Sequence, residues 1–201
     1  MRLDQNQNCG PRHLHCTTGT IFLSMVICIL GLPYSTPGSN PEQITAEYQV
    51  KASYLCNFTK FVEWPTEAFP AQDSALTIGI VGEDPFGQAL DAEALNMTAN
   101  GHKMVVKRFR WDQDFRQSQV IFIGLTEKKH LGPILSSVKG AGVLTVSDIE
   151  NFSSSGGMIG FVFDVDRIRF EINLDPALDS HISISSKLLS LASAVRGKRT
   201  R

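Results

Sequence analysis

The chain has 201 residues, a formal net charge of −1 at pH 7 and 42% hydrophobic residues, which suits one globular domain with its own core. This near-neutral charge argues against a general nucleic-acid binder, because such a protein needs a basic surface to neutralise phosphates. The sequence also contains no long acidic or basic block of the kind that forms a disordered arm.

The first predicted element is a secretory signal peptide over residues 1–38. Residues 20–32, "TIFLSMVICILGL", form an apolar run, which is shorter than the roughly 20 residues that cross a bilayer. Arginines precede this run, and small residues and prolines follow it, in the order of a signal peptide. An uncleaved signal anchor is the alternative. Both interpretations place the predicted domain, residues 39–201, outside the cytoplasm.

Cysteine usage limits the redox chemistry of that domain. Of the 4 cysteines in the chain, only Cys56 follows the signal segment, so the exported domain cannot form an internal disulfide. We expect Cys56 to be a small buried hydrophobic residue. A redox or intermolecular role is the alternative.

A long helix is predicted over residues 41–64. Pro41 suits a first helical turn, and Pro65 withholds the N–H that would continue the helix. The predicted apolar side of this helix consists of Val50, Tyr54, Leu55, Phe58, Phe61 and Val62.

Lys51 falls on that apolar side, between Phe58 and Val62 on the helical projection. A buried ammonium group without a partner would be very costly. The lysine therefore extends its side chain to solvent, pairs with a carboxylate at the edge of the core, or binds an anionic ligand. The sequence leaves these three interpretations open.

Strands and helices alternate in the middle of the chain. Strands are predicted over residues 75–82, 102–109, 119–125 and 142–148 from their apolar and β-branched content. A helix is expected to begin at Asp84 and Pro85, and another is expected over residues 127–140 with a break or a start at Gly132 and Pro133. This order predicts an α/β domain with a mainly parallel sheet.

The last third of the sequence has a different pattern. Residues 156–173 predict two antiparallel strands with a turn near residues 164–166, and an amphipathic helix over residues 188–195 follows. The complete prediction is a single three-layer α/β domain. Its sheet is mixed and mainly parallel, helices cover both faces, and an antiparallel hairpin lies near the C-terminus.

Signals for catalysis are weak throughout the sequence. The chain has no nucleophile elbow, phosphate-binding loop or zinc-protease motif, and His102, His130 and His181 lack metal-ligand spacing. We therefore expect no enzymatic activity, no cofactor and no metal.

The turn "GIVGEDPFG", residues 79–87, lies between a strand and a helix start. Helix N-termini can bind anions, but Glu83 and Asp84 would repel an anion here. A structural turn is therefore favoured over a ligand site.

Two aromatic residues near the end of the first helix also have two interpretations. Phe61 and Trp64 are either core residues that cover one end of the sheet or part of an exposed patch for a partner.

Four blocks in order resemble the YfiR family of exported regulators. They are "VKASYLCNFTKFVEWP", "IGIVGEDPFG", "GVLTVSD" with "FSSSGGMIGF", and "RIRFEIN" with "ISSKLLSLA". The resemblance covers about residues 42–195. It implies a periplasmic, non-enzymatic protein that represses a membrane-bound diguanylate cyclase by binding its periplasmic sensory part. Release of this repression raises cyclic di-GMP and favours biofilm. A mixed sheet with helices on both sides, often in a dimer, is the implied fold.

One feature departs from the family pattern. Some relatives carry cysteines around the third strand and use a disulfide to stay folded and to report redox state, whereas Ser118 and Gln119 stand at that point here. This departure puts a cysteine switch within one chain in doubt. The receptor of this chain also stays open, because family members occur with different sensors.

The leading hypothesis is a periplasmic binding protein that restrains a membrane-bound sensor or diguanylate cyclase by direct contact. The alternative is a periplasmic small-molecule-binding module without a repressor role. A homodimer and a small ligand stay open, and no nucleic acid is expected. The predicted docking or dimer surface consists of Phe58, Phe61 and Trp64. The predicted polar positions around a cleft at the strand ends are Lys51, Asp84, Arg169 and Asn173.

Overall fold

A computed structural model of the protein describes residues 41–69, 71, 73–165 and 167–197. All of these residues belong to one compact unit. The predicted signal peptide, residues 1–38, lies outside the described residues.

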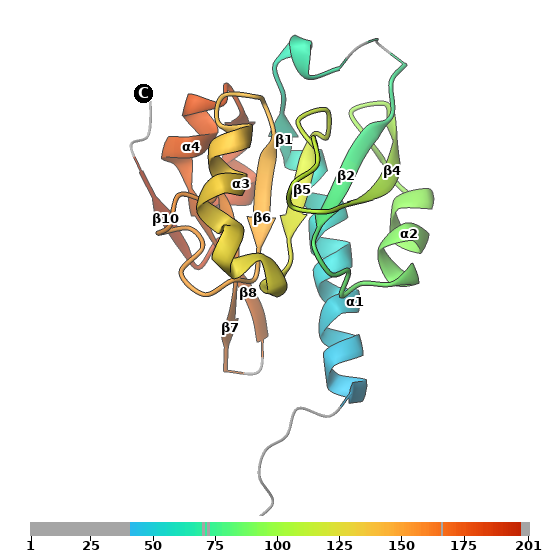
Figure 1. Ribbon diagram of the computed structural model, residues 1–201, viewed down its shortest axis with the longest axis vertical. Helices are drawn as coiled ribbons and strands as arrows, with labels where there is room; N and C mark the ends of the chain where they lie inside the picture. The colour runs from blue at the N-terminus through green and yellow to red at the C-terminus, as the bar shows by residue number, and fades with distance from the viewer. Residues whose placement is uncertain (1–40, 70, 72, 166, 198–201) are drawn as a thin grey trace, which may run out of the picture. The chain divides into compact units, whose positions relative to one another are not determined.

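The domain is an α/β fold built on an eight-stranded mixed sheet with the strand order β10-β8-β7-β6-β5-β2-β4-β3 (Figure 1). Its central strands β4, β2, β5, β6 and β7 are parallel. The sheet consists of β2 (Leu76–Val81), β3 (Thr98–Ala99), β4 (His102–Phe109), β5 (Val120–Ile123), β6 (Leu144–Ser147), β7 (Ile159–Asp164), β8 (Arg167–Asn173) and β10 (Ala194–Arg196). The predicted α/β class and mainly parallel sheet are thus confirmed.

Helices cover both faces of this sheet, as predicted (Figure 1). The alternating side chains of β5 show why. Val120 and Phe122 join the core beneath α1 (Pro41–Phe58) and α2 (Gln88–Leu95). Ile121 and Ile123 join the core beneath α3 (Leu131–Val138). Because both faces are buried, this strand is a continuous apolar run rather than an alternating one.

The first helix ends earlier than predicted. After α1 ends at Phe58, the chain forms a 3₁₀ turn, η1 (Thr59–Phe61), and then the short strand β1 (Val62–Glu63). β1 pairs in antiparallel fashion with β9 (Ser183–Ile184). This pairing requires an extended backbone at Val62, so the predicted helix end at Trp64 is wrong and Pro65 is not the terminator.

Two more boundaries differ in the middle of the chain. The helix expected at Asp84 begins at Gln88, because the preceding residues form a turn. The helix expected over residues 127–140 divides into a 3₁₀ segment, η3 (Leu125–His130), and α3, which begins just before Gly132 and Pro133.

The C-terminal hairpin is confirmed, but the segment after it contains more elements than expected. β7 and β8 pair in antiparallel fashion, with Asp164 opposite Arg167 at the turn. A short helix, α4 (Leu174–Asp179), follows and was not predicted. The final helix, α5 (Ser186–Leu191), stops before Val195, because residues 194–196 form β10 beside β8.

Several short segments complete the described fold, among them η2 (Thr66–Ala68) between β1 and β2. None of the helices in the described part of the chain combines the length and the apolarity that crossing a bilayer requires.

Candidate binding site

Lys51 lies in a buried polar cluster on the inner side of α1. Its ammonium group donates to Asp148 Oδ2 over 2.6 Å, and the two side chains are only 5% and 7% exposed. Glu47, one helical turn earlier, also pairs with Lys51. The structure therefore supports the ion pair with a carboxylate at the core edge, and the interpretation that Lys51 simply extends to solvent is wrong.

The sheet positions Asp148 for this contact, because Asp148 is the first residue after β6 and lies at the carboxyl end of that parallel strand. The preceding Ser147 fixes the turn: its hydroxyl donates to the Ile123 carbonyl over 2.7 Å and accepts from the Ile149 amide over 3.0 Å. The buried carboxylate is thereby held against α1.

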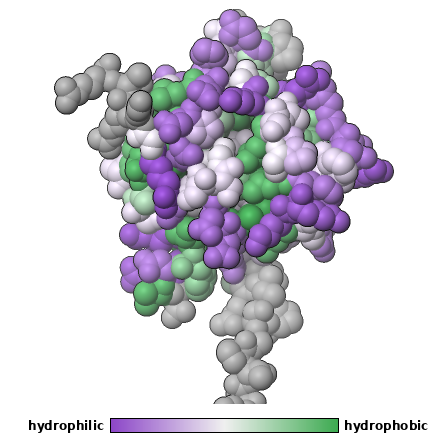
Figure 2. Space-filling model, turned by 60° about the vertical axis from the view of Figure 1, so that its left-hand side comes forward, coloured by the Kyte–Doolittle hydropathy of each residue, from purple (hydrophilic) through white to green (hydrophobic). Residues whose placement is uncertain are grey.

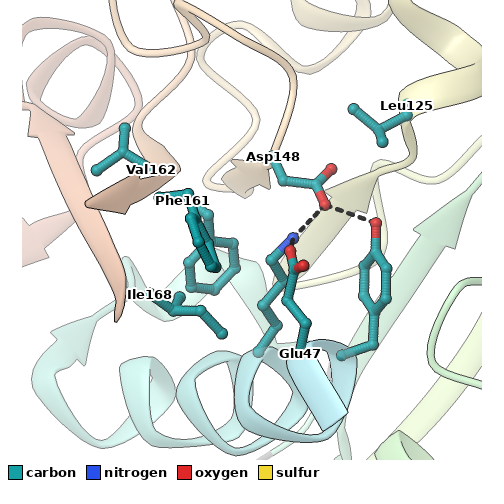
Figure 3. A pocket seen from close by; sticks show the side chains of 9 residues that line it. Glu47, Leu125, Asp148, Phe161, Val162 and Ile168 are labelled. Atoms are coloured by element: carbon teal, nitrogen blue, oxygen red, sulfur yellow. Dashed lines mark hydrogen bonds and ion pairs between the residues drawn. The ribbon is translucent and has the colours of Figure 1, made fainter. Parts of the chain in front are cut away.

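Tyr48 completes the cluster. Its hydroxyl donates to the same Asp148 Oδ2 over 2.8 Å, and its ring lies 4.4 Å from the Lys51 ammonium, which favours a cation–π contact (Figure 3). Burial, reinforced by this hydrogen bond, raises the pKa of the Tyr48 phenol well above its ordinary value of 10.0. The phenol therefore stays protonated at physiological pH and acts as a hydrogen-bond donor.

The second oxygen of the Asp148 carboxylate, Oδ1, is buried and has no hydrogen-bond partner among the described residues. In Figure 3 this oxygen is turned away from both donors, on the side of Leu125. Leaving a buried acceptor unpaired costs about 1–3 kcal/mol, and more when the group is charged. Most buried polar atoms have partners, so the unpaired Oδ1 of Asp148 is an exception that needs a physical explanation.

A hollow of about 360 Å³ opens beside the cluster. Its polar end consists of Glu47, Tyr48, Lys51 and Asp148, and its apolar wall consists of Leu125, Phe161, Val162, Phe163 and Ile168 (Figure 3). The hollow therefore lies between α1, the carboxyl ends of β5 and β6, and the β7–β8 hairpin. Open α/β sheets bind ligands at this edge. An apolar pocket with a few convergent polar groups is typical of a small-molecule site.

The charges that line the hollow argue against the third interpretation of Lys51, an anion ligand. Its single ammonium already pairs with both Glu47 and Asp148. The lining residues thus carry one positive and two negative formal charges. An anion entering this site would meet a net negative charge.

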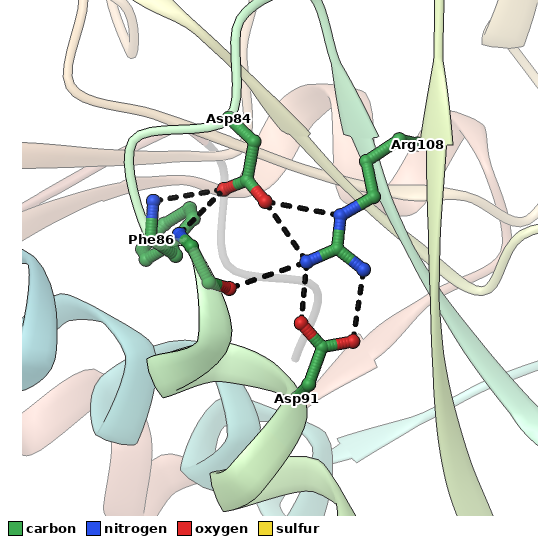
Figure 4. Close-up of polar contacts among 5 residues, drawn as sticks. Asp84, Phe86, Asp91 and Arg108 are labelled. Carbon is green, nitrogen blue, oxygen red and sulfur yellow. Dashed lines mark hydrogen bonds and ion pairs between the residues drawn. The ribbon is translucent and has the colours of Figure 1, made fainter.

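The other predicted cleft residues do not join Lys51. Asp84 lies at the turn before α2, where its carboxylate accepts from the amide of Phe86 over 2.8 Å and from Arg108 Nε over 3.0 Å (Figure 4). Arg108 also forms a two-pronged pair with Asp91, and this hydrogen bonding lowers the pKa of Asp91. The "GIVGEDPFG" turn is therefore held by its own carboxylate, as the structural interpretation requires.

Arg169 and Asn173 lie elsewhere on β8. Arg169 is exposed and stands opposite Val162 in the hairpin. Asn173 caps α4 and donates to the Ser153 carbonyl over 2.8 Å. It lines a different hollow, of about 410 Å³, which α3 and α4 border. The structure thus places only Lys51 of the four predicted polar residues in the hollow beside α1.

The predicted aromatic surface is also divided. Phe58 is 1% exposed and stacks on Phe161 with ring centroids 5.8 Å apart, so it belongs to the core and offers no surface to a partner. Phe61 and Trp64 are partly buried against the same core. The Trp64 indole donates to the Gln119 carbonyl over 2.9 Å.

Sequence reasoning missed Glu47, Tyr48 and Asp148. One signal for Asp148 was present, because "GVLTVSD" ends an apolar parallel strand with a carboxylate at the edge where such sheets bind ligands. The pairing of Asp148 with a helix 97 residues earlier in the chain could not be read from local pattern. Among the described residues, no cluster of histidine, cysteine and acidic side chains could hold a metal ion.

Comparison with known proteins identifies the family. The YfiR/HmsC-like family model matches residues 48–193, which is most of the chain and includes α1 from Tyr48 onward, Asp148 and the hairpin. The chain belongs to the YfiR/HmsC-like family. This match confirms the predicted resemblance to the YfiR family.

One solved structure is also similar to this YfiR/HmsC-like chain. It is the crystal structure of a conserved domain protein from Vibrio cholerae O1 biovar El Tor, with 14% sequence identity and a TM-score of 0.45. The match covers 60% of this chain and 54% of that one, so the chain spans about half the length of this structure.

Proposed function

We propose that the protein is an exported regulator that restrains a membrane-bound signalling protein, a diguanylate cyclase or a related sensor, by direct contact with its periplasmic part. By this proposal the protein binds the inactive state of the receptor more tightly than the active state, and so shifts the population towards inactivity. Loss of the contact would raise cyclic di-GMP and favour biofilm. Membership of a family of periplasmic regulators supports this proposal.

The main structural support for this proposal is the exposed apolar tip of the β7–β8 hairpin. Its strands extend beyond the neighbouring strands of the sheet (Figure 1). At its tip Phe163 is 65% exposed and Val165 is 87% exposed, and Figure 2 shows apolar surface beside hydrophilic surface at this end of the molecule. Val165 also has a φ of 41°, a conformation that β-branched residues seldom adopt. Exposed apolar surface of this kind is typical of a site of protein contact.

A third exposed apolar residue extends this surface. Leu125 is 55% exposed and, together with Phe163, lines the hollow beside α1. The proposed contact surface therefore comprises Leu125, Phe163 and Val165. Aromatic and aliphatic anchors supply most of the binding energy at protein interfaces.

The aromatic surface expected from the sequence stays a prediction for Phe61 and Trp64. Both are partly buried, so each exposes less of its ring to a partner than Phe163 does. A homodimer also stays a prediction, and sedimentation of the purified protein would test it.

The experiment measures binding of the purified protein to inner-membrane vesicles that contain the receptor. The double variant Phe163→Ser with Val165→Ser should remain folded and bind at least about tenfold more weakly, because it removes both anchors of the hairpin tip. The matched control is Leu95→Ser with Leu191→Ser, which removes two exposed apolar residues, 82% and 60% exposed, from α2 and α5. The control should bind like wild type. Equal binding by wild type and the hairpin variant would exclude the hairpin as the contact.

A further inference from the structure

We propose that the hollow between α1 and the β7–β8 hairpin binds a small organic cation, a primary ammonium group attached to an apolar body, with Asp148 as the acceptor for the ammonium. This inference goes beyond the proposed regulatory role. It concerns the isolated protein and holds whether or not the receptor is a cyclase.

One oxygen of the Asp148 carboxylate lacks a partner among the described residues. Both donors in the cluster, Lys51 and Tyr48, bind Oδ2. Oδ1 has no partner among the described residues, although the side chain is only 7% exposed. Asp148 itself lines the hollow. A carboxylate oxygen accepts hydrogen bonds and cannot donate them, so the missing partner is a donor.

The residues that line the hollow carry a net negative charge. Lys51 supplies one positive charge, and Glu47 and Asp148 supply two negative charges. A cationic donor restores neutrality, whereas a carboxylate or phosphate would increase the imbalance. Glu47 is the more exposed of the two acids, at 33% against 7%. It therefore lies nearer the solvent, where it can attract a cation as it enters.

The rest of the wall of the hollow suits an apolar ligand body. Apart from the charged groups and Tyr48, the lining residues are apolar, with the aromatic rings of Phe161 and Phe163 among them. An aromatic wall accepts both an apolar body and the face of a cation. A volume of about 360 Å³ is within the range of small-ligand pockets.

The probe for the test is 2-phenylethylammonium, because it joins a primary ammonium to an apolar ring. Its partners in the test are 2-phenylethanol, which keeps the ring and a neutral donor, and 3-phenylpropionate, which carries a negative charge. Titrations followed by calorimetry and by NMR shifts of α1 and hairpin amides should show saturable binding of the ammonium at about 1 mM or below. The alcohol should bind at least about tenfold more weakly, and the carboxylate should not bind.

Variants of the protein then locate the site. Asp148→Asn should lower the affinity for the ammonium at least about tenfold, and Asp179→Asn should leave it unchanged. Asp179 is a matched control because it lines the other hollow, beside α3. Asp148→Asn also removes the partner of Lys51 and can unfold the domain, so Ile168→Trp is the second variant. It fills the hollow, leaves the charged cluster intact, and should abolish binding.

Three outcomes would overturn the inference. They are equal binding of the three compounds, no binding of the ammonium at millimolar concentration, and unchanged affinity in a folded Ile168→Trp variant. Because no receptor is present in these titrations, their failure would leave the regulatory proposal intact. A failure of membrane binding would equally leave this inference intact.

Discussion

Lys51 and Asp148 form a buried ion pair, with 2.6 Å between the ammonium and one carboxylate oxygen, although 97 residues separate them in the chain. The pair joins the middle of α1 to the end of β6 and borders the hollow where we place the candidate ligand. It explains why a lysine lies on the apolar side of that helix.

The pair yields the first prediction. Lys51→Met should lower the free energy of unfolding by about 3–5 kcal/mol, because it leaves the Asp148 carboxylate buried without a counter-charge. Denaturant unfolding measures this difference. The matched control is Lys103→Met on the exposed side of β4, which should change the stability by less than about 0.5 kcal/mol.

A double variant separates charge from packing at the same position. Lys51→Met combined with Asp148→Leu should recover much of the lost stability, since apolar residues of similar volume can replace a buried ion pair. A single Lys51→Met variant as stable as wild type would show that the pair contributes nothing.

Trp64 gives the second prediction, which tests whether this residue is structural or part of the docking surface. Trp64→Phe should cost about 1–2 kcal/mol, because it removes the hydrogen bond to the Gln119 carbonyl and part of the packing against Phe69. Trp111→Phe is the control, since Trp111 is 41% exposed and should matter little. If the folded Trp64→Phe variant loses membrane binding while the hairpin variant keeps it, the docking surface is at Trp64.

Cys56 gives the third prediction. Burial raises the pKa of its thiol from an ordinary 9.0 to about 12. The native protein should therefore resist alkylation at Cys56 at pH 8, and the unfolded protein should react, because the thiolate is the reactive form. Peptide mass spectrometry after iodoacetamide treatment measures both. Rapid labelling of the folded protein at this residue would support a redox role instead.

The same shift predicts a pH dependence of stability. The raised pKa means that the folded state keeps the proton while the unfolded state loses it between pH 9.0 and about 12. The contribution of Cys56 is therefore fully present below pH 9.0 and is lost as the pH rises through this window. Cys56→Ala should remove that part of the decline, and an identical pH profile in the variant would contradict the assignment.

Local sequence pattern predicted the sheet well and its borders less well. The apolar blocks of β2, β5 and β6 are buried on both faces, so periodicity and β-branched content were sufficient to identify them. β1, β9 and β10 are two or three residues long and exist because of pairing with distant segments. Such pairing leaves no local signal, and this is why helices were predicted where the chain is extended at Val62 and Val195.

The candidate site was only partly predictable for the same reason. An unexpected lysine on an apolar helix face left a carboxylate partner as one of three interpretations, and only the fold selects it and identifies the partner as Asp148. Phe58 was expected on a docking surface because helical projection shows which side is apolar and not which apolar residues are covered. The exposed residues Phe163 and Val165 escaped notice because a hairpin tip with two apolar residues resembles an ordinary strand end.

The most direct test of the central claim is cellular cyclic di-GMP after deletion of the gene in its native host. Deletion should raise cyclic di-GMP, exported wild-type protein should restore the low level, and the folded Phe163→Ser, Val165→Ser variant should not restore it. An unchanged cyclic di-GMP level in the deletion strain would contradict the proposed restraint of a cyclase.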